Sequence, residues 1–402
     1  MIIYIDYFCC MSTSNLQKFN GGNNYANNII TALSKKNVNI KILCPNYCIT
    51  DEIFISLFRS CSNVDFTYCS EKDLIKLTYV DNSVYYMPVL YKIGDFKKIE
   101  QIKKVNHSLK VCATIHDLRM LDYISDKTEK YYLTGFKRIL FPFYHLGIEG
   151  LKAQLVDRHF IKNGIKYLDE IYTVSNYAMQ NIIKIYSDAN VKYYYQSVHF
   201  DTDTKEDVSD DYILFVSGGR RLKNFSHALG GFIQFKKHSP ENTTKLVVTG
   251  IDEKRFKSLC EIYSNDRTII ENFIEFHNYV SNEELDKLYS NCKYLLYVSK
   301  MEGFGLPVLE AARYGKTSIA SNRTAIPEVL GAAIKYVNPL NDAEIASAIE
   351  AFDDSSVLEK YKKRVKESMI FTLKRMDAEE RFLTEDIISV DTVSKKRMTK
   401  WN

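Results

Sequence analysis

The 402-residue chain lacks any apolar run approaching the ~20 residues that a membrane-spanning helix needs, so we expect no transmembrane segment. Its first residues, Met-Ile-Ile-Tyr-Ile-Asp, include no basic segment and already carry the acidic Asp6. This start favours a β-strand over a secretory signal peptide. Internal repeats and low-complexity tracts are also missing. With 46% hydrophobic and 26% charged residues, the composition is that of a globular protein.

The nine cysteines show no paired framework of the kind that cross-links small secreted domains. Cys44 and Cys48 lie four residues apart, but no second pair follows to complete a zinc site. The cysteine pattern therefore favours a reducing compartment, and we expect a cytoplasmic protein.

A strong charge imbalance is missing as well, because the formal net charge is only +4. Nucleic-acid-binding proteins usually carry a larger basic excess together with a recognisable binding module, and this sequence has neither. We expect no nucleic-acid partner.

Short β-rich runs alternate with helical patterns, which is typical of βαβ units and a parallel sheet. The expected strands are 2–8, 38–43, 83–88, 110–115 and 170–174, followed by a second series that starts at 212 and continues with 245–249, 294–298, 317–320 and 334–337. A chain of this length exceeds one ordinary core, so we expect two α/β domains. If both are doubly wound and face each other, ligands bind in the cleft at the carboxyl ends of the two sheets.

A short acidic segment, residues 201–211, separates the two series of strands, and we interpret it as an interdomain linker. The predicted domains are residues 1–200 and 212–370, followed by a helical tail over 371–402. Asp201 and Asp203 have the spacing of a metal-binding pair, but a solvated acidic linker explains them better.

Two carboxylates, Glu302 and Glu310, flank the glycine-rich turn Gly303-Phe-Gly-Leu-Pro307. Glycines let the backbone approach a ligand closely, and Pro307 suits the first position of a helix. We expect that helix to end near Gly315. Its free N–H groups and its dipole favour a phosphate-like anion. This suggests that one carboxylate holds hydroxyl groups while the other faces developing positive charge.

Together with the flanking segments 280–285, 288–292, 297–299 and 325–331, the motif resembles the retaining glycosyltransferases of family 4, which have the two-domain GT-B fold. The resemblance covers residues 212–350 closely and the N-terminal half more loosely. It implies a UDP- or GDP-linked sugar as donor and a glycan or lipid-linked oligosaccharide as acceptor. It also implies no cofactor and no metal, since this family neutralises the diphosphate with protein cations.

The resemblance assigns roles to individual residues. The predicted catalytic residues are His116, Lys223, Arg220 and Glu302, and the predicted donor-binding residues are Gly21, Gly22, Gly218, Arg221, Tyr279, Val280, Phe304, Gly305, Leu306 and Glu310. The cations would neutralise the leaving diphosphate, although which arginine contacts it stays open. Glu310 would accept hydrogen bonds from the ribose, and Tyr279 and Val280 would line the base pocket. Ser175, after an expected strand, would cap a helix or contact a ligand.

The resulting hypothesis is a metal-independent, retaining hexosyltransferase of bacterial surface polysaccharide synthesis, for instance of O-antigen or capsule. Glu302 would stabilise an oxocarbenium-like state, and we favour attack of the acceptor on the face that the diphosphate leaves. Two alternatives stay open: a GT-B sugar-nucleotide epimerase, and a catalytically silent subunit that binds a glycan or a partner.

Residues 130–166 mix aromatic and basic side chains, including Tyr131, Tyr132, Phe136, Lys137, Arg138, Phe141, Phe143, Tyr144, Arg158 and Lys162. Such a mixture suits a membrane surface or a lipid-diphosphate acceptor, although ordinary amphipathic helices look similar. One interpretation is therefore peripheral contact of the N-terminal domain with the inner face of a membrane.

Overall fold

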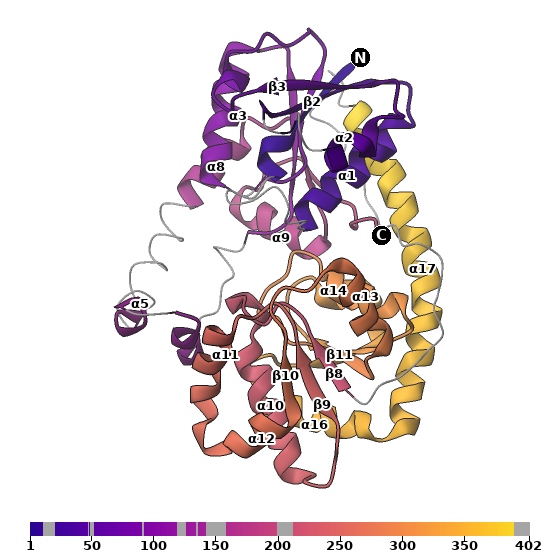
Figure 1. The fold of residues 1–402 in the computed structure, drawn as a ribbon. Coiled ribbons are helices and arrows are strands. Elements are labelled where there is room, and N and C mark those ends of the chain that lie inside the picture. Colours follow the sequence, from indigo (N-terminus) through magenta and orange to yellow (C-terminus); the bar gives the residue numbers. More distant parts are fainter. Residues whose placement is uncertain are drawn as a thin grey trace.

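The computed structural model describes residues 1–10, 21–46, 48, 52–90, 92–118, 126–133, 136–141, 158–198 and 212–389. The described chain forms two α/β domains, one above the other, with a long helix running beside both (Figure 1). The predicted linker 201–211 lies outside the described residues, so the domain boundaries stay predictions.

The first sheet has seven parallel strands in the order β3-β2-β1-β4-β5-β6-β7. They are β1 (Ile2–Asp6), β2 (Asn39–Pro45), β3 (Val64–Cys69), β4 (Val84–Met87), β5 (Lys110–Ile115), β6 (Glu170–Thr173) and β7 (Val191–Tyr193), connected by α1 (Gly21–Ser34), α2 (Glu52–Phe58), α3 (Ile93–Val105), α8 (Arg158–Ile165) and α9 (Asn176–Ile185). All four residues of the central strand β4 are buried, as is typical of a parallel sheet covered on both faces.

The second sheet has six parallel strands in the order β10-β9-β8-β11-β12-β13. They are β8 (Tyr212–Phe215), β9 (Lys245–Val248), β10 (Ile274–Phe276), β11 (Tyr294–Tyr297), β12 (Ser318–Ser321) and β13 (Lys335–Val337). The helices of this domain are α10 (Phe225–His238), α11 (Glu253–Cys260), α12 (Arg267–Phe273), α13 (Asn282–Asn291), α14 (Leu306–Arg313), α15 (Ile326–Leu330) and α16 (Asp342–Asp353). In each sheet the strand order reverses beside the first strand, which creates a topological switch point.

The prediction of two doubly wound parallel sheets is confirmed. Three strands were not predicted, and each lies at the edge of its sheet: β3, β7 and β10. Edge strands are only half covered, and in β3 a single residue of six is fully buried. Such strands lack the continuous apolar run by which the central strands were recognised.

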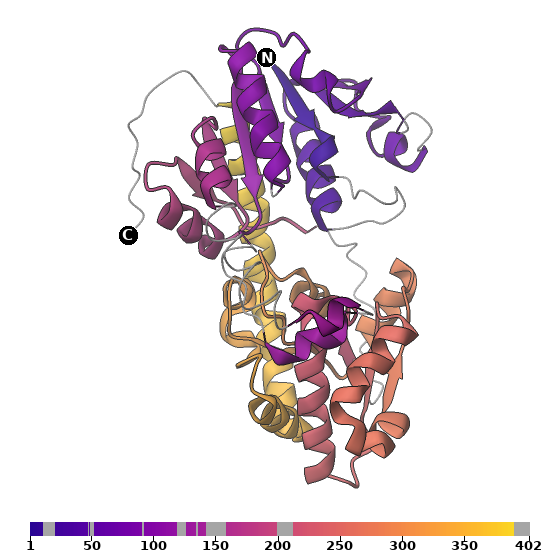
Figure 2. The same ribbon diagram turned by 90° about the vertical axis from the view of Figure 1, so that its left-hand side faces the viewer.

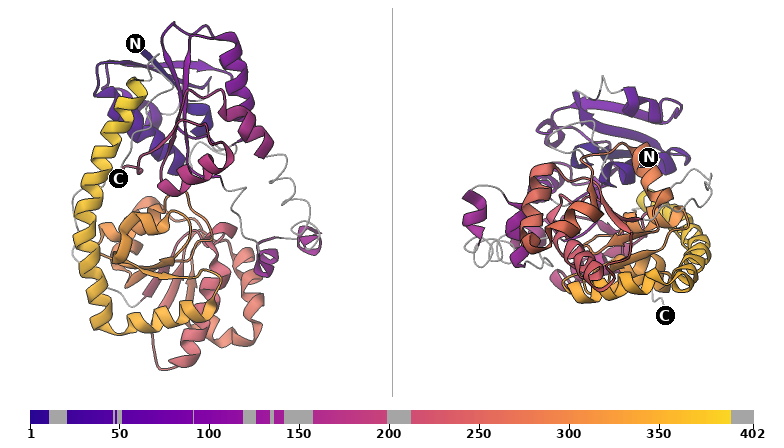
Figure 3. Two further views of the ribbon diagram at one scale, coloured as in Figure 1. Left: turned by 180° about the vertical axis from the view of Figure 1, so that it is seen from behind. Right: turned by 60° about the horizontal axis from the view of Figure 1, so that its bottom comes forward.

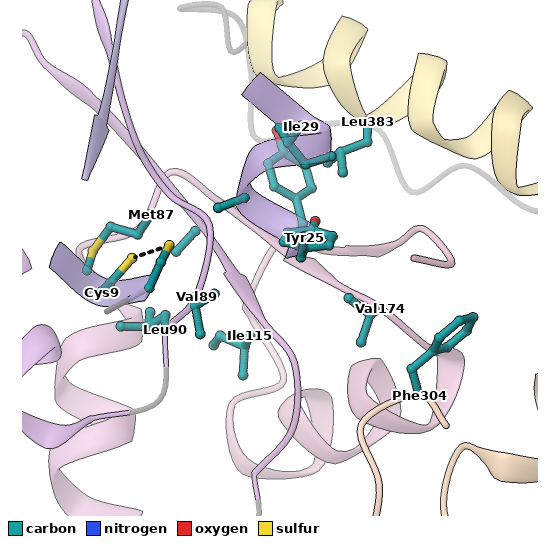
Figure 4. Packing of buried hydrophobic residues seen from close by; sticks show 14 of the residues in the cluster. Cys9, Tyr25, Ile29, Met87, Val89, Leu90, Ile115, Val174, Phe304 and Leu383 are labelled. Atoms are coloured by element: carbon teal, nitrogen blue, oxygen red, sulfur yellow. Dashed lines mark hydrogen bonds between the residues drawn. The ribbon is translucent and has the colours of Figure 1, made fainter. Parts of the chain in front are cut away.

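The helix α17 (Ser355–Ile388) runs along both domains without a break (Figures 1 and 3). Its 34 residues correspond to about 51 Å at 1.5 Å per residue. The helix buries Val365 near its start and Leu383 near its end, and Leu383 lies beside Ile29 of α1 in the first domain (Figure 4). Residue 371, the predicted start of the tail, lies inside this helix.

A segment of the first half of the sequence lies on the second domain (Figure 2). We call residues 126–133 and 136–141 the arm; it contains the 3-10 helix η4 (Lys127–Tyr132) and the short helix α5 (Phe136–Ile139). Tyr132 is buried in the apolar core of the second domain. Its hydroxyl accepts a hydrogen bond from the backbone N–H of Ser226 at 3.1 Å.

For the part of residues 130–166 that the structure describes, side chains of the arm contact the second domain, and the membrane interpretation stays a prediction. Tyr132 and Phe141 are buried, and Arg138 forms a 2.6 Å ion pair with Glu261 of the second domain. These side chains contact protein because the arm packs against α11. Phe143 and Tyr144 lie outside the described residues. Within the described ranges, none of the helices combines the length and apolar character needed to span a bilayer.

An ionic network fastens the arm. Asp126 of the arm forms ion pairs with the buried Lys300 and, at 3.4 Å, with His227 of α10. His227 also contacts Asp342 at 2.6 Å. Burial alone would lower the pKa of His227, but these two carboxylates raise it to about 9.

We predict that replacing Leu383 with alanine lowers the free energy of unfolding by about 2–5 kcal/mol, because a fully buried side chain between α17 and α1 is removed. The neighbouring Phe382 is 56% exposed, so Phe382→Ala should change stability by no more than about 0.5 kcal/mol. Urea denaturation of both variants measures the difference. Equal effects would mean that α17 does not pack on the first domain as described.

We predict that His227 makes stability depend on pH in the alkaline range. Its pKa is raised in the folded state, so its contribution is complete below about pH 6.5 and is lost as the pH rises through about 9. Between these limits the free energy of unfolding should fall by on the order of 3 kcal/mol. Urea denaturation of the wild type and of His227→Gln at both pH values tests this, since the variant should lack the decrease.

Candidate active site

The loops that carry the predicted site meet at the switch point of the second sheet. One loop follows β8 and contains Lys223, and the other follows β11 and contains Glu302. These two strands are hydrogen-bonded neighbours, although the helices α10, α11, α12 and α13 lie between them in sequence. At such a point the connecting helices leave on opposite faces of the sheet and open a crevice for a ligand.

Lys223 and Glu302 form a buried ion pair in this crevice. The Nζ atom of Lys223 lies 2.7 Å from Oε1 of Glu302 and 2.7 Å from the hydroxyl of Tyr297. The hydroxyl of Ser299 donates to the same glutamate oxygen at 2.6 Å. The two charged side chains are only 12% and 14% exposed. The pair therefore ties the 3-10 turn η7 (Arg221–Lys223) to the loop after β11.

The surroundings of Glu302 keep it ionised. Burial alone would raise the pKa of this carboxyl, but the charge of Lys223 and the hydrogen bonds from Lys223 and Ser299 hold it below its usual value of 4.5. A carboxylate that stays negative at neutral pH beside a lysine can stabilise positive charge on one side while the lysine attracts an anion on the other.

His116 from the first domain lies directly against this loop. A β-carbon at Gly303 would be 2.4 Å from the carbonyl oxygen of His116, so only glycine permits this contact between the domains. The Nε2 atom of His116 lies 3.1 Å from the carbonyl oxygen of Pro88 and must carry the proton there, because a carbonyl only accepts. Its ring packs edge-on against Tyr25. The backbone of His116 thus lies against Gly303, the residue that follows Glu302.

The helix α14 starts in the crevice. Gly305 precedes it with a φ of +117°, which glycine adopts without strain. The backbone N–H groups of Phe304, Gly305 and Leu306 donate no hydrogen bond within the described part of the chain. Such unpaired donors at a helix N-terminus attract an anion. The side chain of Phe304 is buried beside Val174 of the first domain (Figure 4).

The paired glycines of the first domain, Gly21 and Gly22, lie at a helix N-terminus. The helix α1 begins at Gly21, so both glycines form its first turn. A β-carbon on Gly21 would lie 3.5 Å from Leu306. The N-termini of α1 and α14 therefore meet across the domain boundary.

Glu310 lies one turn into α14 and accepts a 2.7 Å hydrogen bond from the hydroxyl of Tyr289 in α13. Burial raises the pKa of Glu310 above its usual value, while Tyr289 and the charge of Lys223 act in the opposite direction. The carboxyl is thus fixed near the lysine but is not its ion-pair partner.

Three of the predicted site residues, Gly218, Arg220 and Arg221, lie in the loop after β8, and their contacts differ. Arg220 is exposed and forms no ion pair within the described ranges. Arg221 lies 3.5 Å from Glu129 of the arm. The N–H of Gly218 donates to the carbonyl oxygen of Thr249 at 2.8 Å, so this donor is occupied by the turn itself.

The two predicted base-pocket residues lie apart from the ion pair. Tyr279 is 64% exposed. Val280 lines a cavity of about 530 Å³ together with Tyr212 and Lys245, the first residues of β8 and β9. Because that cavity begins at the amino ends of these strands, it is a different hollow from the crevice around Lys223.

Ser175 acts as a helix cap. Its side chain accepts a hydrogen bond from the N–H of Ala178 at 3.2 Å and is fully buried. The remaining N–H groups at the start of α9 are taken by Glu328 of the second domain, which accepts from Asn176 at 2.9 Å and from Tyr177 at 2.8 Å. The N-terminus of α9 is thus a joint between the domains.

Sequence reasoning missed several residues that hold the site. Tyr289, Tyr297 and Ser299 stand in segments that flank the glycine-rich motif. Nothing in their spacing showed that Tyr289 and Ser299 donate to the two glutamates or that Tyr297 accepts from Lys223. Thr324 was also missed; its hydroxyl accepts a hydrogen bond from the N–H of Glu302 at 3.1 Å.

The chain is similar to known proteins in its sequence. Residues 200–368 match the family described as Glycosyl transferases group 1. The chain is similar to O-antigen chain mannosyltransferase B of Escherichia coli, with 39% identity over 93 residues, which cover 23% of this chain and 24% of that protein. It is also similar to O-antigen chain mannosyltransferase RfbU of Salmonella typhimurium, with 27% identity over 214 residues, which cover 52% of this chain and 57% of that one. The matches span less than two thirds of either relative.

Solved structures resemble the chain over nearly its whole length. Anabaena Alr3699/HepE in complex with UDP and glucose has a TM-score of 0.66 at 12% identity, with coverage of 97% of this chain and 100% of that one. A glycosyltransferase from Rickettsia africae has a TM-score of 0.63 at 15% identity, with coverage of 96% and 98%. At such identities the likeness shows the fold alone, and it confirms the predicted GT-B architecture.

We predict that Lys223→Met leaves Glu302 as an unpaired buried carboxylate. Its pKa should rise above the usual 4.5, and the protein should lose about 3–5 kcal/mol of stability at neutral pH. Adding Glu302→Leu should restore most of this loss. In the wild type the contribution of Glu302 is present above pH 4.5 and is lost as the pH falls through the lowered pKa.

Carbon-13 NMR titration of the glutamate carboxyls and urea denaturation measure these effects. Lys237→Met is the matched control, because Lys237 forms an ion pair with Asp266 on the surface and is 51% exposed. It should cost no more than about 1 kcal/mol. A similar loss in both variants would contradict a special role for the buried pair.

Proposed function

We propose, because residues 200–368 match the family described as Glycosyl transferases group 1, that the protein transfers a hexosyl group from a nucleoside diphosphate sugar to a saccharide acceptor. The observation that carries this proposal is the Lys223–Glu302 pair at the switch point of the second sheet, directly against His116 of the first domain. A departing diphosphate and an electron-poor sugar need opposite charges within one crevice, and this pair offers both.

The donor diphosphate is held by cations and by backbone donors. Lys223 lies beside the N-terminus of α14, whose N–H groups from Phe304 to Leu306 face an anion in this proposal. The exposed Arg220 is the second cation that supports phosphate binding. The carboxylate of Glu310 accepts hydrogen bonds from the ribose hydroxyls. With these cations in place, we propose transfer without a metal ion.

The proposed reaction retains the anomeric configuration. The bond between the anomeric carbon and the diphosphate oxygen breaks, and the acceptor oxygen forms a bond to the same face of that carbon. The acceptor proton moves to the departing phosphate. Glu302 stabilises the positive charge that develops on the sugar ring, and His116 binds a sugar hydroxyl.

We propose mannose as the hexose, since two similar proteins, O-antigen chain mannosyltransferase B and RfbU, are named for its transfer. The acceptor in this proposal is a growing glycan or lipid-linked oligosaccharide of a bacterial surface polysaccharide. Work on such an acceptor would take place in the cytoplasm, with peripheral contact to the inner face of the membrane.

We expect calorimetric titration with UDP, GDP and ADP, without added metal, to show binding of one of them. Glu310→Ala should weaken that binding by about 1–3 kcal/mol, because hydrogen bonds to a charged group are lost. Glu253→Ala, which removes an exposed glutamate of α11, serves as the matched control and should leave the affinity unchanged.

Each of the other possible outcomes would contradict one part of the proposal. Unchanged affinity in Glu310→Ala would remove Glu310 from the ribose site. Absence of binding by the wild type would contradict the transferase and favour a silent binding subunit. Binding followed by conversion of the free nucleotide sugar, with no transfer to acceptor, would favour the epimerase.

A further inference from the structure

Glu129 of the arm is an unusual residue for its position. It belongs to the first half of the sequence, yet its side chain is fully buried at the second domain. Its two carboxylate oxygens contact two cations of that domain: Oε1 lies 2.8 Å from the Nζ atom of Lys300, and Oε2 lies 3.5 Å from Nη1 of Arg221. A fully buried carboxylate is retained only where cations compensate its charge.

Both cations belong to the wall of the crevice. Lys300 lies in the loop between β11 and Glu302, and its backbone N–H donates to the carbonyl oxygen of Leu222 at 2.9 Å. Arg221 is the first residue of the turn η7, whose last residue is Lys223. Carboxylates therefore contact the turn at both ends, Glu129 at Arg221 and Glu302 at Lys223.

The arm is anchored by contacts that do not involve Arg221. The hydroxyl of Thr128 lies 2.8 Å from that of Ser226, the hydroxyl of Tyr132 accepts from the backbone of Ser226, and Ser258 donates to the carbonyl oxygen of Tyr131 at 2.9 Å. These neutral contacts fix the backbone on both sides of Glu129. The position of Glu129 is thus set by the arm, and Arg221 adapts to it.

Arg221 itself is less constrained than its partner. Its side chain is 31% exposed, whereas the side chains of Glu129 and Lys300 are only 0% and 1% exposed. A long, partly exposed side chain loses much rotamer freedom when it binds a ligand, and a fixed carboxylate that already orients it reduces this loss.

We propose that Glu129 is a positioning residue, which holds Arg221 at the edge of the crevice so that its guanidinium is oriented toward the diphosphate of the donor. This inference rests on the proposed function, because it takes a nucleoside diphosphate as the ligand. The donor site on the second domain would then include a residue of the arm. The arm itself lies in the half of the sequence that forms the first domain.

The test compares affinity for a nucleoside diphosphate with affinity for the same nucleoside without phosphates. Calorimetry is carried out on the full chain with whichever of UDP, GDP and ADP binds, and then with the corresponding nucleoside. Glu129→Gln should weaken binding of the diphosphate about fivefold and leave the nucleoside unchanged. A general structural disturbance would weaken both.

A double-mutant cycle shows whether the effect passes through Arg221. Arg221→Gln alone should weaken diphosphate binding at least as much as Glu129→Gln, and the double variant should be no weaker than Arg221→Gln. Additive losses would overturn the proposal, as would unchanged or tighter diphosphate binding by Glu129→Gln. Tighter binding would mean that Glu129 competes with the ligand for Arg221.

Glu261→Gln is the matched control. It breaks the 2.6 Å ion pair between Arg138 and Glu261, which also joins the arm to the second domain but lies away from Arg221. This variant should bind the diphosphate like the wild type. An equal loss would assign the effect to docking of the arm in general and would overturn the specific role of Glu129.

Two further outcomes keep the inference separate from the proposed function. If Glu129→Gln does not fold, Glu129→Asp keeps a negative charge for Lys300 but withdraws it from Arg221, and the same loss specific to the diphosphate is expected. If the wild type binds no nucleoside diphosphate, the proposed function itself fails. If it binds one and neither Glu129→Asp nor Arg221→Gln changes that affinity, only the present inference fails.

Discussion

A carboxylate buried between two domains needs a countercharge, and Lys223 supplies it for Glu302. The two residues follow different strands of one sheet, so their attraction fixes the turn after β8 relative to the loop after β11. Ser299 and Tyr297 complete the hydrogen bonding, which a buried ion pair requires to remain favourable. This loop places Gly303 against His116, and its Gly305 directly precedes α14. The geometry of the crevice therefore depends on this pair.

The two domains are held against each other by contacts of different physical kinds. The helix α17 contributes apolar packing along its length, and Glu328 satisfies the backbone donors at the start of α9. The arm adds an ionic network around Lys300 and buries Tyr132 in the second core. Apolar burial does not depend on the ionisation of a side chain, whereas the ion pairs of His227 weaken when its imidazole loses the proton. The contact between the domains thus has an apolar part that does not depend on pH and an ionic part, at His227, that does.

The sequence predicted what is encoded locally. The central strands are apolar runs, and the segment from Glu302 to Glu310 holds a turn, a helix start and two carboxylates within nine residues. Contacts across long sequence separations were not predictable in this way. Nothing in the composition of the arm distinguishes a side chain that packs on the second domain from one that faces a membrane, since both are aromatic and basic. Likewise Tyr289 and Glu129 become part of the site only through folding, because their partners lie in other elements.

The arm also limits how such a protein can recombine with its relatives. A crossover near the predicted linker 201–211 would exchange one sheet for the other. A chimera made there would inherit an arm from one parent and a second domain from the other. The pocket that Tyr132 fills and the cations that Glu129 contacts would then face foreign side chains. To keep these contacts, residues 126–133 and 136–141 would have to be exchanged together with the second domain.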